Sequence, residues 1–301
     1  MVPMENRKGN ASEITRLSTT AADGTSVCAD VEGEGRIILI LHPGMNTSKS
    51  YTQVAARLAR RYRVIRLHRR QYRLDLKTAP LIGSPCTVAE EVDHVLAMVK
   101  AVGAPVLLFG HSSGGTVALE ALAASPSSFA GGMIYEPALV LKSTDGLHLS
   151  GDRIESNGEV GEELLRMRQA LMKGQPGTAI GMCTRVIAGL PSFVANPAGA
   201  LAALIPAYRQ LIPCQIDDLE AMERLGVRLD AYSKLNLPVT MVYGERSPDE
   251  NLEMVAAVAE VLPRVERIEL RGQGHTCHVR DPKKLAEVIE TFAKGVFEEA
   301  P

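Results

Sequence analysis

The sequence has no tryptophan, and its aromatic residues amount to only 4% of 301. Leucine, isoleucine, valine and alanine must therefore fill the core, and a hydrophobic share of 46% is ordinary for a globular protein. Neither sign of charge dominates, because 33 basic and 35 acidic residues leave a formal net charge of −2. A nucleic-acid groove needs a wide basic face with interleaved aromatic residues, so we expect no nucleic-acid partner.

Paired cysteines and long apolar runs are also missing. The five cysteines are widely spaced and form no CxxC motif, which indicates a reducing compartment and neither zinc nor a redox dithiol. No apolar run reaches the ~18 residues of a membrane span, and Met1–Ser12 is polar, unlike a signal peptide. We therefore expect a cytoplasmic protein without membrane contact, with residues 1–12 as a flexible arm. HxxEH, HxH and clustered carboxylates are absent, so we expect neither a metal nor another cofactor.

Short apolar runs alternate with helical patterns along most of the chain. Strands are predicted at Ile14–Thr19, Thr25–Val31, Arg36–Leu41, Tyr62–Leu67, Val106–Phe109, Gly132–Tyr135, Val239–Tyr243 and Val265–Leu270. Helices are predicted at Ser48–Arg60, Val88–Val102, Ser113–Ala124, Leu252–Val261 and Pro282–Phe297. Continuous apolar runs are typical of strands buried on both faces, and their alternation with helices predicts an α/β fold with a mostly parallel, eight-stranded sheet. Residues 13–137 and 237–301 form this predicted core domain.

The alternation stops between residues 138 and 236, after the sixth strand. Only helices are predicted there, at Gly161–Met172, Gly177–Ala188, Ala198–Leu211 and Ile216–Leu225. Ligands of open parallel sheets bind at the carboxyl ends of the strands, so a helical insertion at this point predicts a cap, or lid, over the site. Tyr208 in this insertion is a candidate substrate contact.

The most informative segment is Gly110-His111-Ser112-Ser113-Gly114, a GxSxG motif between an apolar run and an alanine-rich helix. In that context the serine occupies a tight strand-to-helix turn, and its hydroxyl projects above the sheet. Ser112 is therefore the predicted nucleophile. The N–H of Ser113, at the positive end of the helix, is a predicted oxyanion donor, and His111 is a candidate substrate contact.

A serine hydroxyl needs a base, and His275 follows the last predicted strand, where the chain order Ser, acid, His requires it. His278 is the nearest competitor. The acid has three candidates. Glu136 is favoured because a carboxylate at the end of a buried strand needs a partner, and Asp249 and Glu245 follow the next strand as alternatives.

The loop His42-Pro43-Gly44-Met45 follows the strand Arg36–Leu41 and should supply the second oxyanion donor. Pro43 has no N–H, which leaves Gly44 or Met45. Gly44 is favoured because the substrate carbonyl must approach the backbone closely. His42 and Met45 are further candidates for substrate binding.

Together these motifs resemble the α/β-hydrolase superfamily from about Ile14 to Phe297. They are most similar to a bacterial subgroup in which YEP (135–137) follows the nucleophile and GxxSP (244–248) replaces the usual aspartate loop. The acid position is also similar to that of haloalkane dehalogenases, whose nucleophile is aspartate, whereas serine implies acyl transfer.

One segment departs from the family pattern. Many members carry DxRGxG where this chain has residues 68–73, with Arg69, Arg70 and Arg73. We expect these arginines to form surface ion pairs with carboxylates such as Asp75, the alternative being contacts with a substrate carboxylate or phosphate.

The sequence thus predicts a carboxylesterase-like serine hydrolase for a medium-sized, largely apolar ester, lactone or thioester. A lyase, cyclase or acyltransferase using the same site is the first alternative, because fold and triad underdetermine the reaction. A non-catalytic binding protein is the second. The expected partner is a small, mostly apolar molecule, and a homodimer is left open.

Overall fold

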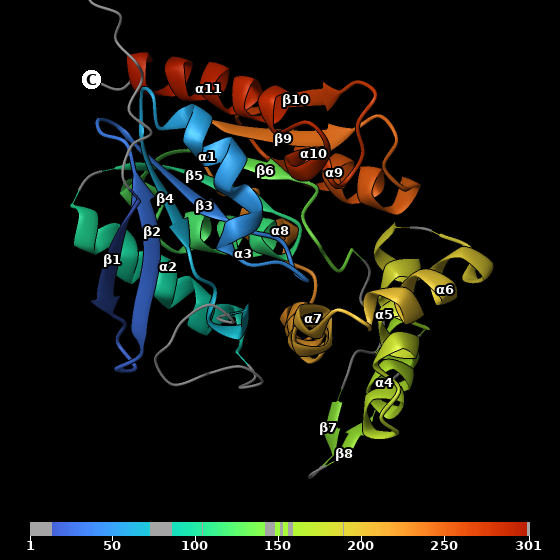
Figure 1. Cartoon of the computed structure of the whole chain (residues 1–301). Helices are drawn as coiled ribbons and strands as arrows, with labels where there is room; N and C mark the ends of the chain where they lie inside the picture. The colour runs from blue at the N-terminus through green and yellow to red at the C-terminus, as the bar shows by residue number, and fades with distance from the viewer. Residues whose placement is uncertain are drawn as a thin grey trace, which may run out of the picture.

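The computed structural model describes residues 14–72, 86–103, 105–141, 148–150, 153–155, 159–188 and 190–299. Its centre is an eight-stranded sheet in the order β1-β2-β4-β3-β5-β6-β9-β10 (Figure 1). Strand β2 is antiparallel to both of its neighbours, and all other pairs are parallel. The predicted mostly parallel α/β sheet is therefore confirmed. The predicted arm, residues 1–12, lies outside the described residues.

The strands lie close to their predicted positions. They are β1 Thr15–Thr20, β2 Ser26–Glu32, β3 Ile37–Leu41, β4 Arg63–Leu67, β5 Val106–His111, β6 Phe129–Tyr135, β9 Val239–Gly244 and β10 Val265–Leu270. Every residue of β3 is buried, as expected of a strand covered on both faces. Ile38 packs into the core on one face and Leu39 into the core on the other.

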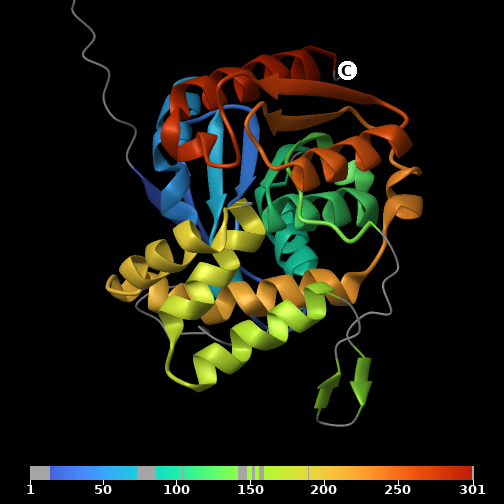
Figure 2. The same cartoon turned by 90° about the vertical axis from the view of Figure 1, so that its right-hand side faces the viewer.

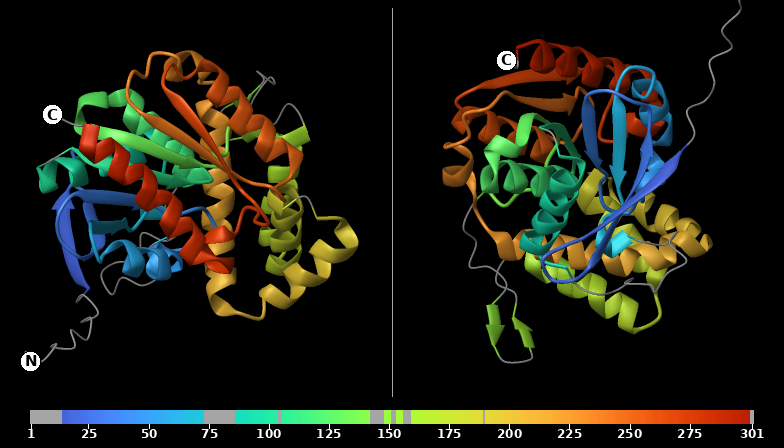
Figure 3. Two further views of the ribbon diagram at one scale, coloured as in Figure 1. Left: turned by 90° about the horizontal axis from the view of Figure 1, so that it is seen from above. Right: turned by 90° about the vertical axis from the view of Figure 1, so that its left-hand side faces the viewer.

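Helices cover both faces of the sheet (Figure 3). Helices α1 (Thr52–Leu58), α10 (Cys277–Arg280) and α11 (Pro282–Glu299) contribute to one core. Helices α2 (Val88–Val102), α3 (Ser113–Ala124), α8 (Leu229–Tyr232) and α9 (Asp249–Val261) contribute to the other. Three short 3₁₀ helices, η1 (Ser48–Tyr51), η2 (Arg70–Tyr72) and η3 (Pro126–Ser128), complete this part of the chain.

The insertion after β6 gathers on one side of the sheet (Figure 2). It contains α4 (Glu159–Met172), α5 (Pro176–Ala188), α6 (Ser192–Ala202) and α7 (Pro206–Leu225). It also contains the antiparallel pair β7 (His148–Ser150) and β8 (Arg153–Glu155), so the prediction of helices alone is wrong. Strands of three residues are too short to show a periodic pattern in a sequence.

The predicted boundary between the last two inserted helices is also wrong. We expected helices at Ala198–Leu211 and Ile216–Leu225, separated near Pro213, but α7 runs through Pro213 and the break lies before Pro206. Proline suits the first turn of a helix, where its missing N–H has no partner to lose, and Pro206 occupies that position. Inside a helix proline costs about 3 kcal/mol, which the burial of the neighbouring Ile212 and Cys214 offsets.

Helix α7 packs against two parts of the molecule. Ile212 and Ile216 belong to an apolar cluster with α4 and α5, whereas Ala221 and Met222 belong to the core beneath the sheet. The helix thus joins the insertion to the sheet. Within the described part of the chain, no helix is long and apolar enough to cross a membrane.

Candidate active site

Ser112 lies in the turn between β5 and α3 with φ 55° and ψ −127°, a strained conformation for a non-glycine residue. The neighbouring glycines make this turn sterically feasible. A Cβ at Gly110 would lie 2.4 Å from the carbonyl oxygen of Gly114, and one at Gly114 would lie 2.5 Å from that of His42. The predicted GxSxG turn therefore has the geometry of a nucleophile elbow, with the Ser112 side chain half-buried.

His275 and Glu136 face each other across the carboxyl end of the sheet. The Nδ1 atom of His275 lies 2.6 Å from Oε2 of Glu136, and Glu136 has a positive φ of 42°. Burial alone raises the pKa of the Glu136 carboxyl. The hydrogen bond and charge of His275, with hydrogen bonds from Ser247 and Gly244, outweigh burial and lower that pKa below its ordinary value. Glu136 is thus an ionised carboxylate in position to orient an imidazole.

The end of β9 and the loop after it hold the other side of this carboxylate. The N–H of Gly244 donates to Oε1 of Glu136 at 2.7 Å, and the hydroxyl of Ser247 donates to the same oxygen at 2.5 Å. The side-chain amide of Asn251, on α9, donates to Oε2 at 2.9 Å. Gly244 and Ser247 are the G and S of the GxxSP motif, the feature that marks this loop in the sequence. Asn251 was missed because nothing marks its position in the sequence.

The two alternative acids lie elsewhere. Asp249 is the first residue of α9 and is exposed. Glu245 is also exposed and accepts a hydrogen bond from the N–H of Gly272 at 2.6 Å. Of the three candidate carboxylates, only Glu136 has a described contact with His275.

Two further histidines lie beneath His275. His111 is fully buried, its Nδ1 lies 2.9 Å from the hydroxyl of Tyr51, and its ring centre lies 4.6 Å from that of His275. His278 stacks on Tyr51 at 5.0 Å. Burial, aided by the charge of His275, lowers the pKa of His278 to about 4 and holds that of His111 well below its ordinary value. Both rings are therefore neutral at neutral pH, and the structure does not place His111 where a substrate could touch it.

The loop after β3 lies between the sheet and α7. Met45 has a positive φ of 54°, is half-buried and packs on the apolar cluster of the insertion. A Cβ at Gly44 would lie 1.9 Å from Oε1 of Gln215 on α7, so a larger residue there requires the Gln215 side chain to move. His42 is buried, and its Nδ1 lies 2.8 Å from the carbonyl of Pro43. Its side chain therefore has almost no exposed surface with which to make the predicted substrate contact. Tyr208, on the first turn of α7, is 38% exposed and has no described contact with Ser112, His275 or Glu136.

The expectation of surface ion pairs is wrong for Arg69. Its side chain is buried and pairs with Glu91 of α2 and Asp218 of α7. Arg70 lies nearer the surface and pairs with Asp23 at 3.4 Å. Arg73 and Asp75 lie outside the described residues. The sequence could not show the partners of Arg69 because they come from helices distant along the chain.

The model of the alpha/beta hydrolase family matches residues 38–288, from β3 to α11. The chain belongs to that family. This alpha/beta hydrolase is similar in fold to an alpha/beta hydrolase from Sphaerobacter thermophilus DSM 20745, with a TM-score of 0.73 and 22% identity over 92% of this chain and 99% of the other. It is also similar to a thermophilic esterase from Thermogutta terrifontis, with a TM-score of 0.71 and 18% identity over 95% and 99% of the two chains.

A bromoperoxidase from Bacillus anthracis has a TM-score of 0.69 and 14% identity to this alpha/beta hydrolase, over 93% and 100% of the two chains. At such identities these similarities show the fold alone. No curated protein sequence shows a significant match to the chain.

Proposed function

We propose that this alpha/beta hydrolase is a serine hydrolase that cleaves a medium-sized, largely apolar ester, lactone or thioester. Ser112 is the nucleophile, His275 the general base and Glu136 the acid. The observation that carries the proposal is the pairing of His275 with the buried, ionised Glu136, combined with a serine in the strained turn of a nucleophile elbow. The N–H of that serine, Ser112, donates to the carbonyl of Tyr135, the residue before Glu136, at 2.9 Å. A binding protein would have no need of this combination of groups.

The reaction follows from the roles of these groups. The Ser112 oxygen attacks the substrate carbonyl carbon while Nε2 of His275 takes the hydroxyl proton, and Glu136 stabilises the imidazolium through Nδ1–H. The tetrahedral oxyanion accepts hydrogen bonds from the N–H of Ser113 and from that of Gly44 or Met45. His275 then protonates the leaving oxygen or sulfur, which departs as an alcohol or thiol or, for a lactone, stays attached to the acyl chain as a hydroxyl. Water repeats the sequence on the acyl-enzyme and releases the acid and free Ser112.

The preference for an apolar substrate is supported by the surroundings of the oxyanion loop. Met45 packs on the apolar cluster that includes Ile212 and Ile216 of α7. Ligand sites are mostly apolar with a few polar anchors, and a half-buried methionine within the proposed oxyanion loop would contribute to such a lining.

The test is labelling of the native protein with a fluorophosphonate, followed by peptide mapping. We expect rapid modification of Ser112 that is lost after heat denaturation and in Ser112→Ala. The same preparations are then given p-nitrophenyl butyrate in ¹⁸O-labelled water, where hydrolysis places ¹⁸O in the released acid. Full turnover by Ser112→Ala, or no labelling of the native protein, would contradict the proposal. Release of p-nitrophenol without ¹⁸O-labelled butyric acid would indicate that the acyl group is transferred to another nucleophile, as in an acyltransferase.

A further inference from the structure

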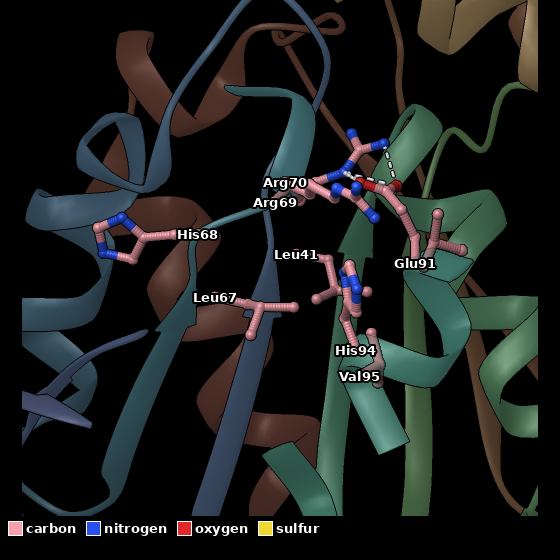
Figure 4. A pocket seen from close by; sticks show the side chains of 9 residues that line it. Leu41, Leu67, His68, Arg69, Arg70, Glu91, His94 and Val95 are labelled. Carbon is pink, nitrogen blue, oxygen red and sulfur yellow. Dashed lines mark hydrogen bonds and ion pairs between the residues drawn. The ribbon is translucent and has the colours of Figure 1, made fainter. Parts of the chain in front are cut away.

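A buried ion cluster lies beneath the oxyanion loop, centred on Arg69 just after β4. The Arg69 side chain is 1% exposed. Its Nη2 atom lies 2.6 Å from Oε2 of Glu91 and 2.7 Å from Oδ1 of Asp218, and its Nε also donates to Glu91 at 3.0 Å. Figure 4 shows Arg69 and Glu91 facing each other, joined by dashed lines. Two carboxylates from different helices thus hold one guanidinium in a fixed orientation.

The remaining guanidinium nitrogen faces the two segments that carry the oxyanion donors. Nη1 of Arg69 donates to the hydroxyl of Ser113 at 2.8 Å and to the carbonyl oxygen of His42 at 3.2 Å. Ser113 supplies the first oxyanion N–H, and His42 begins the loop that supplies the second from Gly44 or Met45. One planar cation therefore spans the two halves of the oxyanion hole.

Asp218 connects this arrangement to α7. Its Oδ2 accepts from the hydroxyl of Ser113 at 2.5 Å and from that of Tyr72 at 2.7 Å. The same Tyr72 hydroxyl lies 3.5 Å from Oε1 of Gln215, the atom that occupies the space beside Gly44. The Ser113 hydroxyl accepts from Arg69 and donates its one proton to Asp218, so it joins the two charged groups.

Arg69 remains protonated in its buried position. Burial lowers its pKa, but the charges of Asp218 and Glu91 outweigh burial and raise that pKa well above the ordinary value. An arginine fork is planar and pre-organised, so it holds several acceptors in fixed directions. A lysine ammonium in the same place is a point charge that cannot span them all.

We propose that Arg69 is a positioning residue of the oxyanion hole. It holds the N–H of Ser113 and the loop His42–Met45 at a fixed separation, and Asp218 makes that separation depend on the seating of α7. The inference rests on the proposed function, since it requires an oxyanion to form on the Ser112 adduct. Donors aligned with a transition state raise kcat rather than substrate affinity, and a misplacement of ~1 Å costs about 10²-fold.

The first experiment compares Arg69→Lys with the wild type, using p-nitrophenyl butyrate as substrate and phenylboronic acid as inhibitor. Phenylboronic acid adds to a serine hydroxyl as a tetrahedral anion and so reports on the oxyanion hole. We expect kcat to fall about 10- to 100-fold with KM changed less than about threefold, and the inhibition constant to rise by about the same factor as kcat falls. Loss of packing alone would not produce this pattern.

Arg66→Lys is the matched control. Arg66 lies on β4 three residues earlier, is 2% exposed and also pairs with a buried carboxylate, that of Glu32. It donates to the carbonyl of Ser48 and has no described contact with Ser113 or His42. We expect Arg66→Lys to lower the melting temperature comparably while kcat stays within about twofold of the wild type.

A second pair of variants tests the link to α7 and decides the question if Arg69→Lys does not fold. Asp218→Asn weakens the bonds to Arg69 and Ser113, whereas the adjacent Asp217 pairs with Arg168 of α4 instead. Both substitutions remove one buried charge from the same helix. We expect at least about a fivefold loss of kcat in Asp218→Asn and less than about a twofold change in Asp217→Asn, with circular dichroism unchanged in both.

The outcomes separate this inference from the proposed function. An active wild type with unchanged kcat in a folded Arg69→Lys, or in Asp218→Asn where Arg69→Lys does not fold, would overturn the inference alone. A rise in KM without a fall in kcat would do the same, because Arg69 would then act on substrate binding. A wild type that neither hydrolyses esters nor reacts with a fluorophosphonate at Ser112 would overturn both.

Discussion

Nδ1 of His275 lies 2.6 Å from Oε2 of Glu136, although 139 positions separate the two residues in the chain. The carboxylate that meets His275 therefore follows β6. The end of β9, the loop after it and the first turn of α9 supply three hydrogen-bond donors to this carboxylate. This division of roles between two adjacent loops gives the first two predictions.

Glu136→Gln should lower kcat about 10²- to 10⁴-fold, because an amide cannot hold the same imidazole tautomer or stabilise the imidazolium. The measurement is kcat and KM with p-nitrophenyl butyrate. Asp249→Asn and Glu245→Gln are the controls, since both residues are exposed, and we expect them to change kcat less than about twofold. Loss of activity in Asp249→Asn alone would mean that the acid is wrongly assigned.

A carboxylate placed at position 247 should restore part of the kcat that is lost in Glu136→Gln. Because the hydroxyl of Ser247 lies 2.5 Å from Glu136, a carboxylate at position 247 would occupy the same small space. Ser247→Asp alone should be destabilised, since two carboxylates so close cannot both ionise. Combined with Glu136→Gln, Ser247→Asp should regain about tenfold in kcat relative to Glu136→Gln. A double variant no more active than Glu136→Gln would show that the loop after β9 cannot place an acid against His275.

Stability should depend on pH through His278. Its pKa is about 4 in the folded protein because of burial, and 6.5 is its ordinary value, so between these values the unfolded chain binds the proton and the folded chain does not. Unfolding is therefore favoured as pH falls from 6.5 toward 4, by on the order of 3 kcal/mol from this residue. His278→Phe, which keeps a ring against Tyr51, should show a shallower fall in the free energy of unfolding over this range. Urea titrations of both proteins at several pH values measure it, and equal slopes would contradict the prediction.

Gly44→Ala should lower kcat about tenfold, because its Cβ would lie 1.9 Å from Oε1 of Gln215, and that buried side chain or the loop after β3 must move. Gln215→Ala opens this space, so the double variant should recover part of the loss, which a double-mutant cycle measures. Gly295→Ala on α11 is the control, since nothing lies within 4 Å of the added Cβ there, and it should leave kcat unchanged. Additive effects of the two substitutions would show that Gly44 and Gln215 do not interact.

Much of the sheet and of the nucleophile turn could be predicted from the sequence, because the signals are local. Buried strands such as β3 appear as continuous apolar runs, and α2 and α3 have the predicted bounds. The GxSxG turn is recognisable because two glycines are needed within five residues. In the insertion the local signals failed. Pro213 is accommodated within α7 by its buried neighbours, and β7 and β8 are too short to leave a pattern.

The sequence by itself determined the α/β architecture, the position of Ser112 in its turn and the order in which the candidate acid and base follow it, because periodicity and turn chemistry act over a few residues. Only the tertiary structure decided that Glu136, rather than Asp249 or Glu245, meets His275, and that Arg69 is buried between Glu91 and Asp218 rather than paired at the surface. These contacts join residues far apart in the chain. Which of several like charges becomes buried and paired depends on how the helices pack on the sheet, and no local pattern records that packing.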